Sequence, residues 1–146
     1  MGNKQAGFTV IEMLIVLTII LMITTFSMNQ MVKSTTNDPL EDFLEQLEKD
    51  IFMMQQQAMT KQKQLSLLFH LNEHYYMIYD SPLNPAILKR DYDHRLQLDL
   101  TSINNPLHYR SSGVPINPGS FILTYNEKHY KVTFPFGKGR FYVTEL

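Results

Sequence analysis

One apolar segment near the N-terminus constrains this chain more than any other feature. Residues 8–28 are mostly Ile, Leu, Val, Met, Phe and Thr. Because a helix rises ~1.5 Å per residue, a helix of this length would span roughly 31 Å, close to the hydrocarbon thickness of a bilayer. The segment nevertheless contains one carboxylate, Glu12. A charge at bilayer depth costs roughly 2.5–3.5 kcal/mol, so such a residue usually has a partner or a function.

The residues that flank this segment do not form a standard secretory signal. Lys4 is the only positive charge before the segment, and no pair of small residues that would mark a cleavage site follows it. One interpretation is therefore a plain membrane anchor, in which Glu12 lies one turn inside the membrane and reaches back to the interface. Lys4 then favours a cytoplasmic N-terminus, with the bulk of the chain outside.

The stretch KQAG followed by FTVIEML, residues 4–14, supports a second interpretation. It resembles the class III leader of type IV pilins and pseudopilins, in which a short hydrophilic leader ends in Gly and FTLIEML follows. Val10 is the one departure from that pattern. The resemblance implies that a prepilin peptidase cleaves between Gly7 and Phe8 and methylates the new N-terminus of Phe8. Residues 1–7 would then be a leader peptide that is removed.

The resemblance also gives Glu12 a role. Cleavage would create a cationic amine at Phe8 in a poorly solvated setting. Glu12 of a neighbouring subunit would neutralise this amine, and each charge would offset the desolvation penalty of the other. In pilin-like assemblies this pairing is held to set the axial register between subunits.

A second helix is predicted after the apolar segment. Asp38 suits an N-cap, Pro39 suits the first helical position, and Glu41 stands at the capping-box spacing. Apolar residues then recur at three- and four-residue steps to about residue 63, which indicates an amphipathic helix with a core-facing stripe. Pro39 predicts a break or kink between residues 34 and 38. The stripe comprises Leu40, Phe43, Leu44, Leu47, Ile51, Met54 and Ala58.

Beyond residue 64 the pattern changes to strands. Hairpins are predicted from residues 65–71 with 75–79 and from residues 121–125 with 129–134, besides single strands at 95–100 and 141–144. The order predicts an α+β fold in which a helix packs on an antiparallel β-sheet. This agrees with the pilin fold. The resemblance implies a transmembrane helix over 8–30, a linker and amphipathic helix over 31–63, and an extracytoplasmic β domain over 64–146.

No motif in the chain predicts catalysis, a metal site or a cofactor. Cysteine is absent, which excludes disulfides, a thiol nucleophile and thiolate metal ligands. Residues 70–74 match the string H-x-x-E-H of one zinc-peptidase class, but that chemistry needs a helix, and these residues sit in a predicted hairpin. The acidic stretch 91–94 lacks the spacing of an EF-hand-like calcium loop, so a solvated loop is expected.

The C-terminal region concentrates positive charge. Its cations interleave with aromatic residues, the mixture that single-stranded nucleic acid sites use. The interpretation that we favour is a strand pair with buried aromatics and solvated cations, because aromatics in short strands are usually buried. Contact with DNA is the second interpretation. The cations are Lys128, Lys131, Lys138 and Arg140.

Two classes of function remain. The first is a structural subunit, and the second is a tethered enzyme or binding domain; the leader favours the subunit. Size, lack of cysteine and the acidic helix after Pro39 resemble the D-type minor pseudopilin of the Gram-positive competence operon. That resemblance implies a non-enzymatic role in DNA uptake, in priming or capping a filament, with other pseudopilins, the prepilin peptidase and the membrane as partners and the cell surface as destination. The alternative is an H-type minor pseudopilin of type II secretion, which Phe134-Pro135-Phe136-Gly137 loosely resembles.

Overall fold

The structure is a computed structural model that describes residues 10–31 and 38–146. The chain divides into two units, residues 1–36 and residues 37–146, and each is described by itself. The predicted cleavage site between Gly7 and Phe8 lies outside the described residues, and so does residue segment 32–37 of the predicted linker.

The first unit contains helix α1 (Val10–Met31). The large apolar side chains of residues 10–22 are exposed, from Val10 at 80% to Met22 at 74%. Among the described residues, no helix combines the length and apolar character that crossing a membrane requires. The transmembrane helix expected over residues 8–30 therefore stays a prediction.

The second unit begins with helix α2 (Pro39–Lys61). Asp38 is its N-cap and accepts a hydrogen bond of 3.0 Å from the Leu40 N–H, which satisfies one of the backbone donors that a helix start leaves open. Gln62 ends the helix in the left-handed conformation, and its N–H donates to the Ala58 carbonyl. The predicted start at Pro39 is confirmed, and the predicted end near residue 63 is two residues late.

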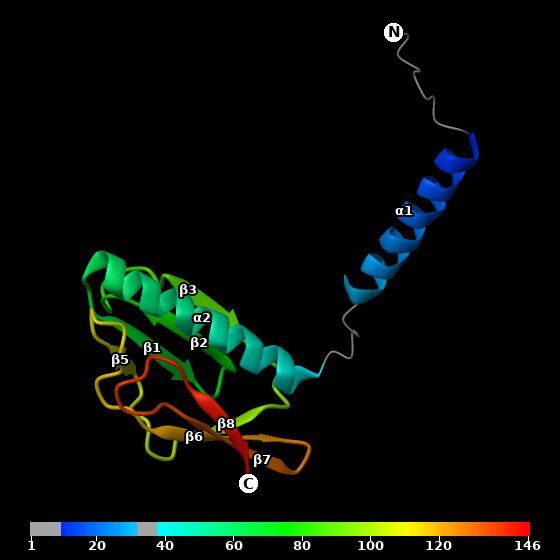
Figure 1. Ribbon diagram of the computed structural model, residues 1–146. Helices are drawn as coiled ribbons and strands as arrows, with labels where there is room; N and C mark the ends of the chain where they lie inside the picture. The colour runs from blue at the N-terminus through cyan, green and yellow to red at the C-terminus, as the bar shows by residue number, and fades with distance from the viewer. Residues whose placement is uncertain (1–9, 32–37) are drawn as a thin grey trace. The chain divides into compact units, whose positions relative to one another are not determined.

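In the described part of the chain, eight antiparallel strands form two sheets instead of the single sheet that was expected (Figure 1). The first has the order β3-β2-β1-β5, and the second has the order β4-β6-β7-β8. The two predicted hairpins are confirmed as β1 with β2 and β6 with β7. The bounds are β1 (Leu65–His70), β2 (Tyr75–Tyr79), β3 (Leu88–Asp91), β4 (Gln97–Asp99), β5 (Leu107–Tyr109), β6 (Ser120–Tyr125), β7 (Lys128–Thr133) and β8 (Tyr142–Glu145).

The core lies between α2 and the two sheets. Five members of the predicted stripe on α2 are buried, whereas Leu40 and Leu44 pack at its margin. Burying each large apolar side chain stabilises the fold by roughly 1.5–3 kcal/mol. The α2 stripe therefore holds the sheets, as expected for an α+β fold. The buried stripe residues are Phe43, Leu47, Ile51, Met54 and Ala58.

Candidate functional site

Glu12 lies in the first turn of α1 and is exposed. An acid in this position is favourable, because the N-terminal end of a helix carries partial positive charge. The exposed carboxylate is accessible to a group from another molecule. Pairing of Glu12 with the amine of a neighbouring subunit stays a prediction, as do cleavage and methylation at Gly7 and Phe8.

A buried carboxylate, Asp50, joins α2 to the first sheet. Its side chain is 6% exposed. The Tyr76 hydroxyl on β2 donates to Asp50 Oδ2 at 2.7 Å, and the Arg90 Nε–H on β3 donates to the same oxygen at 3.1 Å. Gln46 Nε2, one turn earlier on α2, donates to Asp50 Oδ1 at 3.0 Å. Both oxygens of the buried charge are therefore occupied, as burial requires.

This cluster shifts the pKa values of its partners. Burial, followed by the hydrogen bond to Asp50, raises the pKa of Tyr76 far above its ordinary value. The hydrogen bond to Asp50 also raises the pKa of Arg90. Tyr76 thus remains a neutral donor and Arg90 a cation. The arrangement fixes α2 against β2 and β3, and both Asp50 oxygens already accept donors from this unit, so we interpret it as structural.

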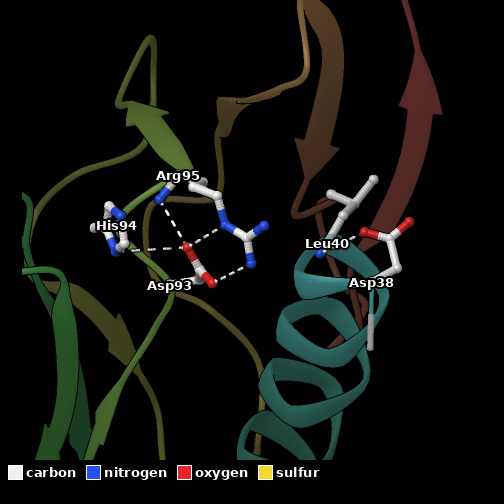
Figure 2. Close-up of polar contacts among 5 residues, drawn as sticks. All are labelled: Asp38, Leu40, Asp93, His94 and Arg95. Carbon is white, nitrogen blue, oxygen red and sulfur yellow. Dashed lines mark hydrogen bonds and ion pairs between the residues drawn. The ribbon is translucent and has the colours of Figure 1, made fainter. Parts of the chain in front are cut away.

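The loop before β4 is closed by an ion pair beside the N-terminus of α2 (Figure 2). Arg95 contacts both carboxylate oxygens of Asp93, at 2.9 and 2.7 Å, and the Arg95 backbone N–H donates to Asp93 Oδ1 at 2.9 Å. These hydrogen bonds hold the pKa of Asp93 well below its usual range. Since the Asp93 oxygens already accept these donors, the loop has the form of a closed turn rather than a calcium loop.

The two histidines of the H-x-x-E-H string do not converge. His70 ends β1 and stacks on Tyr75 at 4.3 Å between ring centroids, whereas His74 has a left-handed backbone and its ring meets Tyr92 edge-on. His70 Nδ1 lies 3.6 Å from Glu73 Oε2. Among the described residues, no three side chains of metal-binding type gather in one place. The prediction of a hairpin here is confirmed.

The four C-terminal cations do not form one stripe. Lys128 and Lys131 are three residues apart on β7, so their side chains project from opposite faces of the sheet. Lys128 Nζ lies 3.1 Å from Glu145 Oε1, and the Arg140 guanidinium lies over the Phe52 ring of α2 at 5.8 Å. Lys138 is exposed in the β7–β8 connection. Contact of these residues with DNA stays a prediction.

Sequence reasoning missed the Asp50 cluster. One signal was present: Asp50 interrupts the buried face of α2 next to Ile51 and between Leu47 and Met54. An acid on a core-facing stripe needs a partner. Tyr76 and Arg90 could not be found in this way, because they are brought opposite each other only by the β2–β3 register.

Comparisons with known proteins agree with this description. Residues 2–28 match the family described as the prokaryotic N-terminal methylation motif. Over 140 residues the chain is 29% identical to competence protein ComGD of Bacillus subtilis (strain 168), covering 94% of this chain and 92% of the relative.

Solved structures show the same fold. The type IV minor pilin FimU of Pseudomonas aeruginosa (strain PAO1) is 15% identical, with a TM-score of 0.62 over 75% of this chain and 91% of that one. The minor pseudopilin EpsH of the type 2 secretion system of Vibrio cholerae is 12% identical, with a TM-score of 0.54 over 75% of this chain and 97% of that one.

The fold and the N-terminal motif together resemble those of the type IV pilin-like class. Within that class the chain resembles the minor pseudopilin ComGD, since its likeness to competence protein ComGD extends over nearly the whole of both sequences.

Proposed function

We infer that this chain is a minor subunit of a competence pseudopilus, a type IV pilin-like filament that takes up exogenous DNA. The observation that carries this inference is the combination of an N-terminal methylation motif with likeness to a competence protein over 94% of the chain. The role is structural, in priming or capping assembly with the other pilins of the filament.

In this proposal the N-terminal segment carries the cleavage site, the membrane anchor and the residue that sets the axial register between subunits. The prepilin peptidase cuts between Gly7 and Phe8 and methylates Phe8. The apolar segment anchors the subunit in the cell membrane with its C-terminal unit outside. In the filament the exposed Glu12 carboxylate neutralises the amine of an adjacent subunit, because an unpaired charge in an apolar setting is costly.

The test is the intact mass and N-terminal sequence of the protein from membranes of its own host, with and without the peptidase. A mature chain that begins at methylated Phe8 is expected only when the peptidase is present. Glu12→Gln should then reduce filament assembly and transformation, whereas Glu127→Gln, a matched change at an exposed turn, should not. An uncut chain in the competent host would overturn the proposal.

A second function is favoured by the structural likeness to a type 2 secretion pseudopilin. The two are separated by deleting the chain in its host. Loss of transformation with normal protein secretion supports the competence role, and the reverse result supports a secretion role.

A further inference from the structure

Strand β8 is an open edge of the second sheet (Figure 1). The Leu146 N–H donates to the His129 carbonyl of β7 at 2.9 Å, so this pair is a hydrogen-bonded one. Bonded and non-bonded pairs alternate in an antiparallel ladder, so Thr144 also faces β7. The N–H and C=O groups of Val143 and Glu145 therefore point away from β7, toward the open edge.

A groove runs between this strand and α2. It consists of two hollows of about 520 and 330 Å³ that share Glu45, Glu48 and Phe141 in their linings. Much of the lining is apolar and reachable from solvent: Phe52 is 47% exposed and Tyr142 is 54% exposed. We call it the α2–β8 groove, with apolar walls formed by Leu40, Leu44, Phe52, Phe141, Tyr142 and Val143.

The α2 side of the groove carries a rim of glutamates on neighbouring turns: Glu41, Glu45 and Glu48. Lys49 lies 2.8 Å from Glu45, and Arg140 lies over the ring of Phe52 at the far end. Within residues 10–31 and 38–146, no cationic side chain forms an ion pair with Glu41 or Glu48. The rim therefore has a net negative charge and two glutamates available to a partner.

This charge selects among the molecules that the groove can hold. The phosphates of nucleic acid and of anionic lipids would meet like charge at the rim. A second copy of this chain paired edge to edge through β8 would bring two glutamate rims together. A basic polypeptide meets opposite charge, and the unpaired backbone groups of Val143 and Glu145 favour one that is extended.

We propose that the α2–β8 groove binds an extended basic segment of another protein, which adds a strand to β8. The main chain of the segment pairs with Val143 and Glu145. Every second side chain of the added strand points toward α2, so this set includes apolar groups that enter the groove and lysine or arginine groups that reach Glu41 and Glu48. This docking surface lies in the unit 37–146 and does not involve Glu12, so it goes beyond the proposed role of the N-terminus.

The test uses the full-length protein in its own host, with the photo-crosslinking residue p-benzoylphenylalanine in place of Tyr142. The same substitution at Tyr79, on β2 of the other sheet, is the matched control. Mass spectrometry of the cross-linked peptides is expected to give, at Tyr142 alone, a segment of another protein with net positive charge.

Two variants then test the chemistry. Glu41→Lys combined with Glu48→Lys should reduce cross-linking at Tyr142 roughly tenfold. Reversing the basic residues of the cross-linked segment should restore it. Val143→Pro removes an N–H of the open edge and leaves the Thr144 and Leu146 donors to β7, so it should also reduce cross-linking.

Several results would overturn the proposal. They are cross-links chiefly to a second copy of this chain, to nucleic acid or to an acidic segment, equal yields at Tyr79, and no cross-link at all. A cross-link that survives the combined Glu41→Lys and Glu48→Lys change alone would do so as well. If Val143→Pro fails to fold, the charge reversal and its restoration decide the matter alone.

Discussion

The Tyr76 hydroxyl donates a hydrogen bond of 2.7 Å to the buried carboxylate of Asp50, and this contact ties the central part of α2 to β2. Arg90 stands opposite Tyr76 in the β2–β3 register and reaches the same oxygen. A single acid on α2 thus contacts side chains of both β2 and β3 and fixes how these two strands pack on the helix. The stability of the second unit therefore depends on a polar contact among these three groups inside its core.

Removing the acid should cost more than removing the arginine. Asp50→Ala leaves the Tyr76 hydroxyl buried without an acceptor, so we expect the free energy of unfolding to fall by roughly 2–4 kcal/mol. Arg90→Ala should cost about 1 kcal/mol or less, because the Arg90 side chain is 45% exposed and water can replace it. Urea unfolding of the full chain in detergent, followed by near-ultraviolet circular dichroism, measures both.

The dichroism signal suits this purpose because the chain has no Trp and all of its tyrosines lie beyond residue 37. The tyrosine part of this signal therefore reports on the second unit alone. Equal losses for the two variants would contradict the assignment of Asp50 as the buried partner.

Alkaline pH should destabilise the second unit. Burial raises the pKa of Tyr92 to about 12 and raises that of Tyr76 further. In the unfolded chain a tyrosine ionises near pH ~10, so above that pH the unfolded state binds fewer protons than the folded state. The stabilisation is complete below pH ~10. It is then lost by up to ~1.4 kcal/mol per pH unit for each buried tyrosine until its folded pKa is reached.

The control for this pH dependence is a pair of phenylalanine variants. Tyr76→Phe should lower the slope of stability against pH above pH ~10, because one titrating group is removed. Tyr142→Phe is the matched control for removing a phenol, at a side chain that is 54% exposed. Urea midpoints measured between neutral pH and pH ~11 give the slopes; equal slopes in the two variants would refute the role of Tyr76.

How far the fold could be predicted depended on local signals. The local sequence predicts where helix α2 starts, at Asp38 and Pro39, and which face of the helix is buried. The β6–β7 hairpin is marked by Asn126, which adopts the positive φ that such turns need. Strands β3 and β5 have four and three residues and carry no such signal. They are held by register with β2 and β1, which no short window of sequence contains.

The candidate sites divide in the same way. The leader and Glu12 form a contiguous motif, and their roles are predicted from it. The α2–β8 groove and the Asp50 cluster join residues that lie far apart in the sequence: Tyr76 is 26 positions from Asp50, and Arg90 is 40 positions from it. Only the pairing of strands creates them.

An asparagine side chain substitutes for a strand on one edge of β1. Asn105 Oδ1 accepts from the Phe69 N–H at 2.9 Å, and Asn105 Nδ2 donates to the Phe69 carbonyl at 2.8 Å. Asn105→Ala leaves both backbone groups of the buried Phe69 without partners, so we expect a loss of roughly 1–3 kcal/mol in the free energy of unfolding. Asn104→Ala, at the exposed neighbouring position, should change it by less than ~0.5 kcal/mol.

Asn105→Asp sharpens this test. The carboxylate can still accept from the Phe69 N–H, but it offers no donor to the Phe69 carbonyl and places negative charge beside it. Asn105→Asp should therefore remain destabilised at neutral pH, as judged by urea unfolding. A fully stable aspartate variant would mean that only the accepting half of the contact matters.

The β7–β8 connection crosses α2 at Gly139 with no room for a side chain. A Cβ at this position would collide with the Gln55 side chain and lie 2.6 Å from the Gly113 carbonyl oxygen. The Tyr109 hydroxyl donates to the Gly139 carbonyl at 2.9 Å, so the segment cannot simply move away. Gly139→Ala should therefore lower the free energy of unfolding by roughly 1–3 kcal/mol through overpacking.

A double variant identifies which contact causes this loss of free energy of unfolding. Gln55→Ala removes the side chain that the new Cβ would strike, while the Gly113 backbone remains in place. We expect the pair Gly139→Ala and Gln55→Ala to recover part of the loss, with a coupling free energy of roughly 0.5–3 kcal/mol in a double-mutant cycle measured by urea unfolding. Strict additivity would show that Gln55 is not the obstacle. The collision with the Gly113 backbone, which no side-chain substitution can relieve, would then account for the whole effect.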